Sequence, residues 1–212
     1  SLISRSYHEQ RDQNVILAID CGRRMRALDG DISQFDHCLN AMLLLAYVAL
    51  KQGDNVGVMA YGGSDRWLAP VKGVNSMTTI LNHLYDYKTS SSPSDYGEAV
   101  ERIMIRQKRR SMVVFISNFR GEDASELIDP LRKLRQKHIV CLGNIREREI
   151  EHVMEEEVET LNEAIRLASI QRYLDSRELV MKQLKNMNIP SVDVTAESLP
   201  VERMHHQLVS PQ

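Results

Sequence analysis

The segment Asp20-Cys-Gly-Arg-Arg24 places an acid, a thiol and two guanidinium groups directly after a continuous apolar run. An acid in that position could bind a metal ion, and such a loop could also hold a phosphate or carry a nucleophile. A cysteine phosphatase loop, however, needs an arginine where this chain has Ala27. The glycine patterns of nucleotide-binding loops are also absent, because Gly22 stands alone and no Gly-Lys-Ser/Thr ending occurs. A metal site remains open, as does the alternative that Asp20 only caps or pairs within its own loop.

The other nucleophiles and histidines form no recognisable catalytic arrangement. A serine hydrolase needs Gly-x-Ser-x-Gly, and the nearest text, Tyr61-Gly-Gly-Ser-Asp65, fits a hairpin turn better. His205 and His206 have no second cluster at metal-ligand spacing, so we interpret them as solvated side chains. The three cysteines lie far apart without a CxxC pair, which predicts free thiols in a reducing compartment.

Composition and charge favour an ordinary globular protein. Of the 212 residues, 42% are hydrophobic and 26% charged, and the formal net charge is -2. These values suit one soluble α/β domain and give no basic field to attract nucleic acid or an anionic membrane. A basic cluster at 106–110 and an acidic stretch at 147–159 each fit either a solvated helix end or a contact surface. Together they favour a protein partner over DNA.

Strands alternate with helices along the whole chain, and the apolar runs are typical of strands buried on both faces. We expect strands at 14–20, 55–61, 111–117, 138–145 and 191–194, and helices at 34–52, 76–85, 96–107, 124–137, 157–187 and 199–208. The turn at 62–64 leads back into 66–71, which predicts an antiparallel edge strand. The sequence thus predicts one α/β domain over 1–212, with a doubly wound, mostly parallel sheet, one antiparallel edge strand and helices on both faces.

The sequence also allows predictions for two helices and three loops. Helix 34–52 is apolar almost all round, so we expect it to be central and buried. Pro130 predicts a kink or a shifted start in helix 124–137. In such sheets ligands bind at the carboxyl ends of the strands. The loops concerned follow Asp20, precede Tyr96 and follow Ser117.

Long motifs are spread over nearly the whole chain. They cover residues 12–25, 36–50, 53–57, 109–115 and 189–193, among them Asp12-Gln-Asn-Val-Ile-Leu-Ala-Ile-Asp20 and Gly53-Asp-Asn-Val-Gly57. In these motifs the chain closely resembles the bacterial domain-of-unknown-function family 58. The resemblance implies a von Willebrand factor A-like, Rossmann-like domain. It also implies a full-length protein that is commonly anchored in the membrane and encoded beside a MoxR-type AAA+ ATPase.

The start of the chain fits the longer members of that family. Ser1 stands where a complete chain has methionine, and the first expected strand follows closely. We therefore expect the C-terminal part of a longer, membrane-anchored bacterial protein. This domain would lie on the cytoplasmic face and contact the membrane only through the missing N-terminal anchor.

The resemblance also implies where a metal-ion-dependent adhesion site would lie. Asp20 matches its first acid, and Ser94 is the best match to its threonine. Gly22 and Arg24 stand where its two serines should be, and Asn118 replaces its last acid. A guanidinium about 5 Å from a divalent ion would cost roughly 7 kcal/mol at an effective dielectric of about 20. We expect a degenerate site in which a divalent cation is not favoured, with Arg24 turned either toward Asp20 or to solvent.

These observations lead to an expected function. We expect a non-catalytic protein-interaction domain without a cofactor, whose partner, by resemblance, is a MoxR-type AAA+ ATPase in the assembly or maturation of a complex. Arg24 and the acidic stretch at 147–159 would supply charge complementarity. Two alternatives stay open, a metal-assisted hydrolase that uses Asp20 and Asp95, and a nucleic-acid-binding module that uses 106–110. The net charge argues against the second.

Overall fold

The computed structural model describes residues 12–145, 148–155 and 157–194 of the chain, and its centre is a six-stranded sheet in the order β5-β4-β1-β6-β7-β8. The strands are β1 (Asn14–Asp20), β4 (Asn55–Tyr61), β5 (Arg66–Lys72), β6 (Met112–Ser117), β7 (Ile139–Ile145) and β8 (Ser191–Val194). Neighbouring strands pair in parallel, except that β5 lies antiparallel to β4 at one edge. The predicted sheet, including its antiparallel edge strand, is confirmed.

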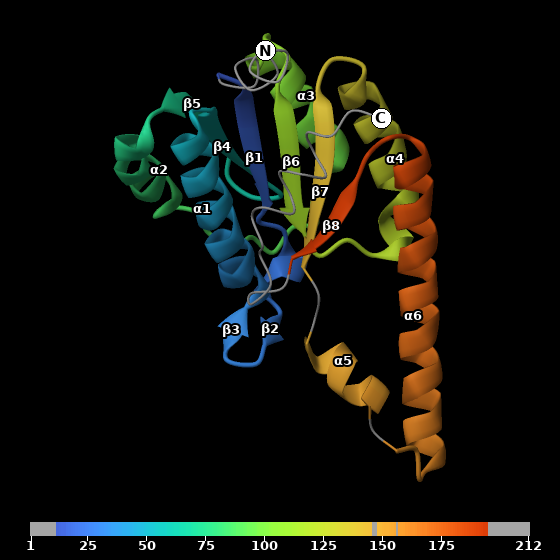
Figure 1. Ribbon diagram of the computed structural model, residues 1–212. Helices are drawn as coiled ribbons and strands as arrows, with labels where there is room; N and C mark the ends of the chain where they lie inside the picture. The colour runs from blue at the N-terminus through green and yellow to red at the C-terminus, as the bar shows by residue number, and fades with distance from the viewer. Residues whose placement is uncertain (1–11, 146–147, 156, 195–212) are drawn as a thin grey trace, which may run out of the picture.

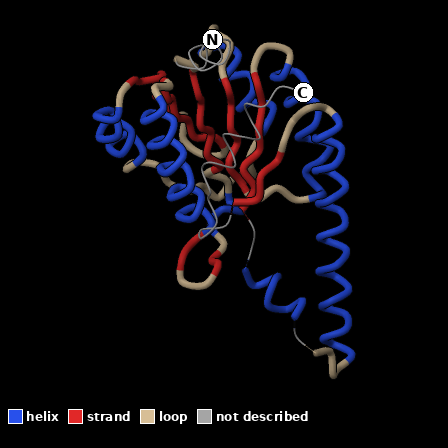
Figure 2. Tube along the Cα trace, in the orientation of Figure 1, coloured by secondary structure: helices blue, strands red, loops and turns tan. Residues whose placement is uncertain are grey.

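Helices cover both faces of this sheet (Figure 1, Figure 2). They are α1 (Gln34–Gln52), α2 (Met77–Leu84), α3 (Tyr96–Arg106), α4 (Ala124–Arg135), α5 (Arg148–Glu155) and α6 (Leu161–Asn186). Short 3-10 turns are η1 (Arg23–Arg26), η2 (Val74–Ser76) and η3 (Gly121–Asp123), and a small hairpin joins β2 (Leu28–Asp29) to β3 (Ile32–Ser33). The core between the sheet and α1 and α2 fills one face, and a second core lies under α3, α4 and the C-terminal part of α6.

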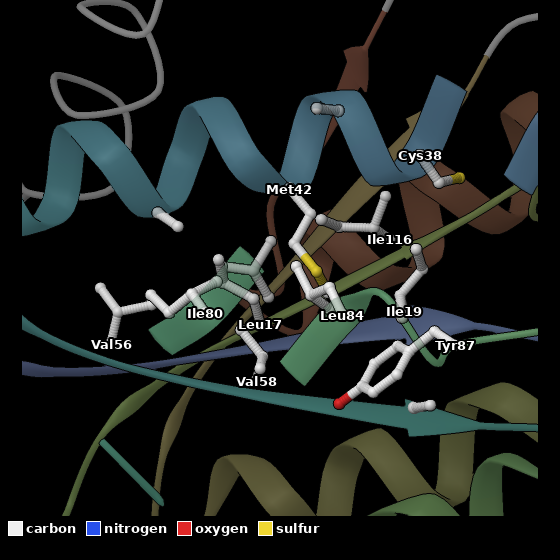
Figure 3. Packing of buried hydrophobic residues seen from close by; sticks show 14 of the residues in the cluster. Leu17, Ile19, Cys38, Met42, Val56, Val58, Ile80, Leu84, Tyr87 and Ile116 are labelled. Carbon is white, nitrogen blue, oxygen red and sulfur yellow. The ribbon is translucent and has the colours of Figure 1, made fainter. Parts of the chain in front are cut away.

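Strand β1 contributes to both cores. Leu17 and Ile19 point to the first core, where they pack with Met42 of α1 and Ile80 of α2 (Figure 3). Ile16 and Ala18, which alternate with them along the strand, belong to the second core, because successive side chains of a strand point to opposite faces. Burial on both faces explains why the run from 14 to 20 is almost continuously apolar, and it brings the polar Asp20 to a buried edge of the sheet.

Side-chain caps set the ends of the helices that flank the site. The Ser33 hydroxyl accepts the backbone N–H of Asp36 at 3.1 Å, and Gly53 ends α1 in the left-handed region with φ +94°. Asp95 starts α3 by accepting the N–H of Glu98 at 2.9 Å. The cap on α3 fixes the direction of the loop that precedes it, which returns to the carboxyl end of β1.

Three expectations about helices met different outcomes. The prediction that α1 is central and buried is wrong for its outer side: Leu44 and Tyr47 are 39% and 40% exposed, because the sheet covers only one side of the helix. Of the kink or shifted start predicted for α4, the shifted start does not occur, since the helix begins at Ala124 and contains Pro130. The helix predicted at 199–208 lies outside the described residues.

Two further elements were not predicted from the sequence. The β2–β3 hairpin and α5 both lie on the side of the sheet where β1 and β7 end (Figure 1). The start of α6 at Leu161, rather than at about 157, follows from a capping box between Thr160 and Glu163. Among the described helices, none is long and apolar enough to cross a membrane.

Candidate functional site

Asp20 lies at the carboxyl end of β1, and its carboxylate is buried among internal donors. Oδ1 accepts the backbone N–H of Gly22 at 2.8 Å and the hydroxyl of Ser94. Oδ2 accepts the hydroxyl of Ser117 at 2.5 Å. The parallel register pairs Ile19 with Ile116, so the next residues along each strand, Asp20 and Ser117, come to lie side by side. Both carboxylate oxygens are therefore bonded within the domain.

The burial of Asp20 predicts a stability effect. Burial raises the pKa of Asp20, and the hydrogen bonds from Ser117, Ser94 and Gly22 offset only part of that rise. A carboxyl group whose folded pKa is raised stabilises the fold below its unfolded pKa, and this stabilisation is lost as the pH rises through the folded value. At neutral pH, well above the ordinary pKa of an aspartate, the burial of Asp20 therefore lowers the free energy of unfolding.

We expect Asp20→Asn to raise the melting temperature at pH 7. The amide keeps the shape of the side chain without the buried charge: its oxygen can still accept from Gly22 and Ser94, and its NH2 group can donate to the Ser117 hydroxyl oxygen. Each kcal/mol gained corresponds to about 2–4 °C in a chain of this size. Thermal melts at several pH values check this: the advantage of the variant should shrink as the pH falls toward 4, and an advantage that does not depend on pH would contradict the assignment.

The Ser94 side chain fills the space that a side chain at position 22 would need. A Cβ built on Gly22 would lie 2.1 Å from the Ser94 hydroxyl, so a serine at position 22 does not fit while Ser94 is in place. The loop before α3 is tied down beside this point, because Arg23 N donates to Ser92 O at 2.8 Å and Ser90 N donates to Cys21 O at 2.7 Å. The hydroxyl beside Asp20 thus comes from the loop before α3, and not from the β1 loop.

Arg24 pairs with η3, which corrects the expectation that it would turn to Asp20 or to solvent. Its Nη1 donates to Asp123 Oδ2 at 2.5 Å and its Nη2 to Asp123 Oδ1 at 3.0 Å. A third contact joins Nη2 to Glu122 Oε1 at 3.2 Å. The guanidinium prefers this partner because the planar fork matches both oxygens of one carboxylate. The backbone N–H of Arg120 also donates to Asp123, at 2.9 Å, and holds it in place.

Asn118 faces a different neighbour from the one that the family pattern suggests. Its side-chain amide donates to Oε1 of Gln34, at the start of α1, at 2.9 Å, and both residues are buried. The contact with Asp20 is made instead by the preceding residue, Ser117. Ser117 was missed from the sequence, although a polar residue that ends a buried strand beside β1 is a usable signal. No comparable feature of the sequence marks Asp123 as a residue of the site.

A small hollow of about 70 Å³ opens beside these groups. Its lining residues are Asp20, Arg23, Arg24, Pro93, Ser94, Tyr96, Asp123 and Glu126. Asp95 lines a neighbouring hollow of about 300 Å³, in which Asp20 takes no part. The two acids that a hydrolase would need therefore face different hollows, and Asp95 is already engaged in capping α3.

Sequence comparison connects this chain with a known family. The model of the family described as "Protein of unknown function DUF58" matches residues 1–177. The chain belongs to this family. No curated protein matches the sequence of this DUF58 chain.

Solved structures share the fold of the DUF58 chain. They include the SpRpn10 VWA domain (10% identity, TM-score 0.53, covering 92% of this chain and 94% of that one). They also include the conserved hypothetical protein BatB from Bacteroides thetaiotaomicron (15% identity, TM-score 0.56, covering 92% of this chain and 96% of that one). A third is an aerotolerance-related membrane protein from Bacteroides fragilis NCTC 9343 (18% identity, TM-score 0.51, covering 92% of this chain and 98% of that one). At these identities the likeness shows the fold alone, and the predicted von Willebrand A-like fold is confirmed.

The residues of this DUF58 domain do not fit the cation shell that the fold family implies. A divalent cation prefers several hard oxygen ligands. Here the Asp20 carboxylate accepts three internal hydrogen bonds, Gly22 has no side-chain oxygen, and the guanidinium of Arg24 lines the same hollow. Within the described ranges, no three His, Cys, Asp or Glu side chains are placed to hold a metal ion.

Proposed function

We propose that this domain is a non-catalytic protein-interaction module that recognises a partner across the carboxyl-end loops, without a cation at Asp20. One observation carries the proposal: the polar groups at the adhesion-site positions are already bonded to other groups of the same domain. The Ser94 and Ser117 hydroxyls donate to Asp20, and Asp123 holds Arg24. The resulting surface is preorganised, and its recognition would depend on shape and paired charges.

The partner that we propose is a MoxR-type AAA+ ATPase, and the process is the assembly or maturation of another complex. The support is the family resemblance, together with the exposed charges around the hollow. Arg23 and Glu126 both line the hollow, are exposed to solvent and carry opposite charges. We also propose that the domain lies on the cytoplasmic face of a longer, membrane-anchored protein.

The two alternative functions gain no support from the local chemistry. Burial, and secondarily the charge of Asp20, raises the pKa of the Cys21 thiol to about 12, so the thiol is protonated at neutral pH and a poor nucleophile. In the basic cluster, Arg106 pairs with Asp65 at 2.9 Å and lies over the Trp67 ring. That cluster precedes β6, at the opposite end of the sheet from Asp20.

Calorimetry tests the absence of a metal requirement. We expect no magnesium or manganese binding in the micromolar range, because a cation would have to displace three hydrogen bonds from Asp20 and face the charge of Arg24. Micromolar binding that disappears in Asp20→Ala would overturn this part of the proposal.

Co-precipitation tests the partner and the surface. We expect the full-length protein to retain the MoxR-type ATPase of the same bacterium. Arg24→Ala should weaken retention by about thirtyfold or more, as for a buried hydrogen-bonded charge at an interface. Arg26→Ala is the matched control, since this exposed arginine ends the same 3-10 turn and does not line the hollow. Recovery of no ATPase, or equal losses in the two variants, would contradict the proposal.

A further inference from the structure

The end of α5 and the start of α6 form the tip of an arm that projects beyond the sheet, on the side where β1 and β7 end (Figure 1). The helix α6 contacts the body at Tyr173, whose ring lies against the Arg120 guanidinium, and at Ser176, which packs on Gly121. From 161 to 172, all described, no side chain is buried. At 1.5 Å per residue, these twelve residues extend α6 about 18 Å beyond Tyr173.

The tip, defined as residues 154–155 and 157–165, concentrates exposed apolar side chains. Met154, Val158, Leu161 and Ile165 are 43%, 46%, 76% and 57% exposed. They are four of the thirteen large apolar side chains that are exposed in the described part of the chain. Leu161 and Ile165 are four residues apart on α6 and share one face. Exposed apolar clusters of this kind mark surfaces that another molecule covers.

The charge of the tip is of one sign. Glu155, Glu157, Glu159 and Glu163 are exposed around the apolar side chains, and residues 154–165 contain no lysine or arginine. Such a surface repels nucleic acid and anionic membranes, which are themselves negative. It is complementary to a protein segment that combines apolar side chains with lysine or arginine.

The tip is held in one shape by its own hydrogen bonds. The Thr160 hydroxyl accepts the N–H of Glu163 at 3.3 Å, and the Glu163 carboxylate accepts the N–H groups of Thr160 and Glu159 at 2.8 and 2.9 Å. This capping box fixes the start of α6 and the direction in which Leu161 leaves the turn. A partner would meet a preformed surface and would lose less affinity to the ordering of the tip.

We propose that the tip is a docking surface for a basic amphipathic helix of a partner protein. The apolar face of that helix covers Leu161 and Ile165, and its lysines or arginines meet the glutamates that surround them. A second copy of this chain is a poorer occupant, because two tips bring glutamates of the same sign together. The tip lies apart from the hollow at Asp20, so this surface and the proposed function stand or fall separately.

A pair of model peptides tests this surface. The probe is a helical peptide of about five turns with leucines at i, i+3, i+4 and i+7 and lysines elsewhere; its control carries glutamates in place of the lysines. Fluorescence anisotropy with the full 212-residue chain should detect binding of the basic peptide only. The double variant Leu161→Asp/Ile165→Asp should weaken that binding by about tenfold or more. Leu179→Asp should change it by less than about twofold, since Leu179 is 68% exposed on the same helix but outside the tip.

Several outcomes would overturn the proposal. No binding of the basic peptide, equal binding of the acidic peptide, or the same loss in Leu179→Asp would each do so. A dimer in sedimentation that becomes a monomer in the double variant, without peptide binding, would assign the tip to a second copy instead. Thermal melts of all variants should match the wild type, because the replaced side chains are exposed. Arg24→Ala should bind the peptide as the wild type does, which separates this test from the proposed function.

Discussion

Replacement of Gly121 by alanine is expected to lower the free energy of unfolding by about 3 kcal/mol. A Cβ added at Gly121 would lie 2.7 Å from the Cβ of Ser176 and 2.8 Å from its carbonyl carbon. Because the second atom belongs to the backbone of α6, no change of rotamer relieves the contact. Either η3 or α6 must move, and this movement separates elements that are packed directly on each other.

Chemical denaturation and thermal melts of Gly121→Ala check this expectation. A loss of about 3 kcal/mol corresponds to a melting temperature lower by about 6–12 °C. Gly97→Ala is the matched control, because its Cβ would meet only the flexible Asp95 side chain, at 3.2 Å, and its stability should stay within about 1 kcal/mol of the wild type. If Gly121→Ala unfolds like this control, α6 is not packed tightly on η3.

The sheet could be predicted from the sequence because burial leaves a direct mark on it. The runs at 14–20 and 111–117 are apolar on both faces, and Gly62-Gly63-Ser64 marks the turn into the antiparallel edge strand. The same reasoning failed for α1, because some of its apolar side chains are exposed to solvent. It also missed the two-residue strands β2 and β3, which are too short for periodicity to reveal.

Half of the candidate site could be anticipated, and the rest depends on contacts between distant segments. Asp20 was singled out by its place after an apolar run and Ser94 by the family pattern, and the structure brings them together across 74 positions of the chain. The partner of Arg24 lies 99 positions away in η3, in a loop with several acids, and no local pattern selects Asp123 among them. The contact with Ser117 follows from strand register, which becomes usable only once β1 and β6 are known to be neighbours.

The Arg24–Asp123 pair therefore leads to the second large effect, a loss of about 2–3 kcal/mol in Asp123→Ala. The side chains of Arg24 and Asp123 are 28% and 9% exposed, so removal of the carboxylate leaves a mostly buried guanidinium without its main partner. A fully buried pair costs about 3–5 kcal/mol when one member is removed, and the partial exposure of Arg24 reduces that value. The N–H of Arg120 also loses its acceptor.

Glu122→Ala provides the matched control for this prediction. Glu122 also contacts Arg24, at 3.2 Å, but its side chain is 69% exposed, so its loss should cost less than about 0.5 kcal/mol. A double-mutant cycle of Asp123→Ala with Arg24→Ala should give a coupling energy of more than about 1 kcal/mol, because the two residues form one bidentate contact. If Asp123→Ala is as mild as Glu122→Ala, Arg24 is not anchored by η3. It would then be free to turn toward Asp20, and the observation on which the proposed metal-independent surface rests would be lost.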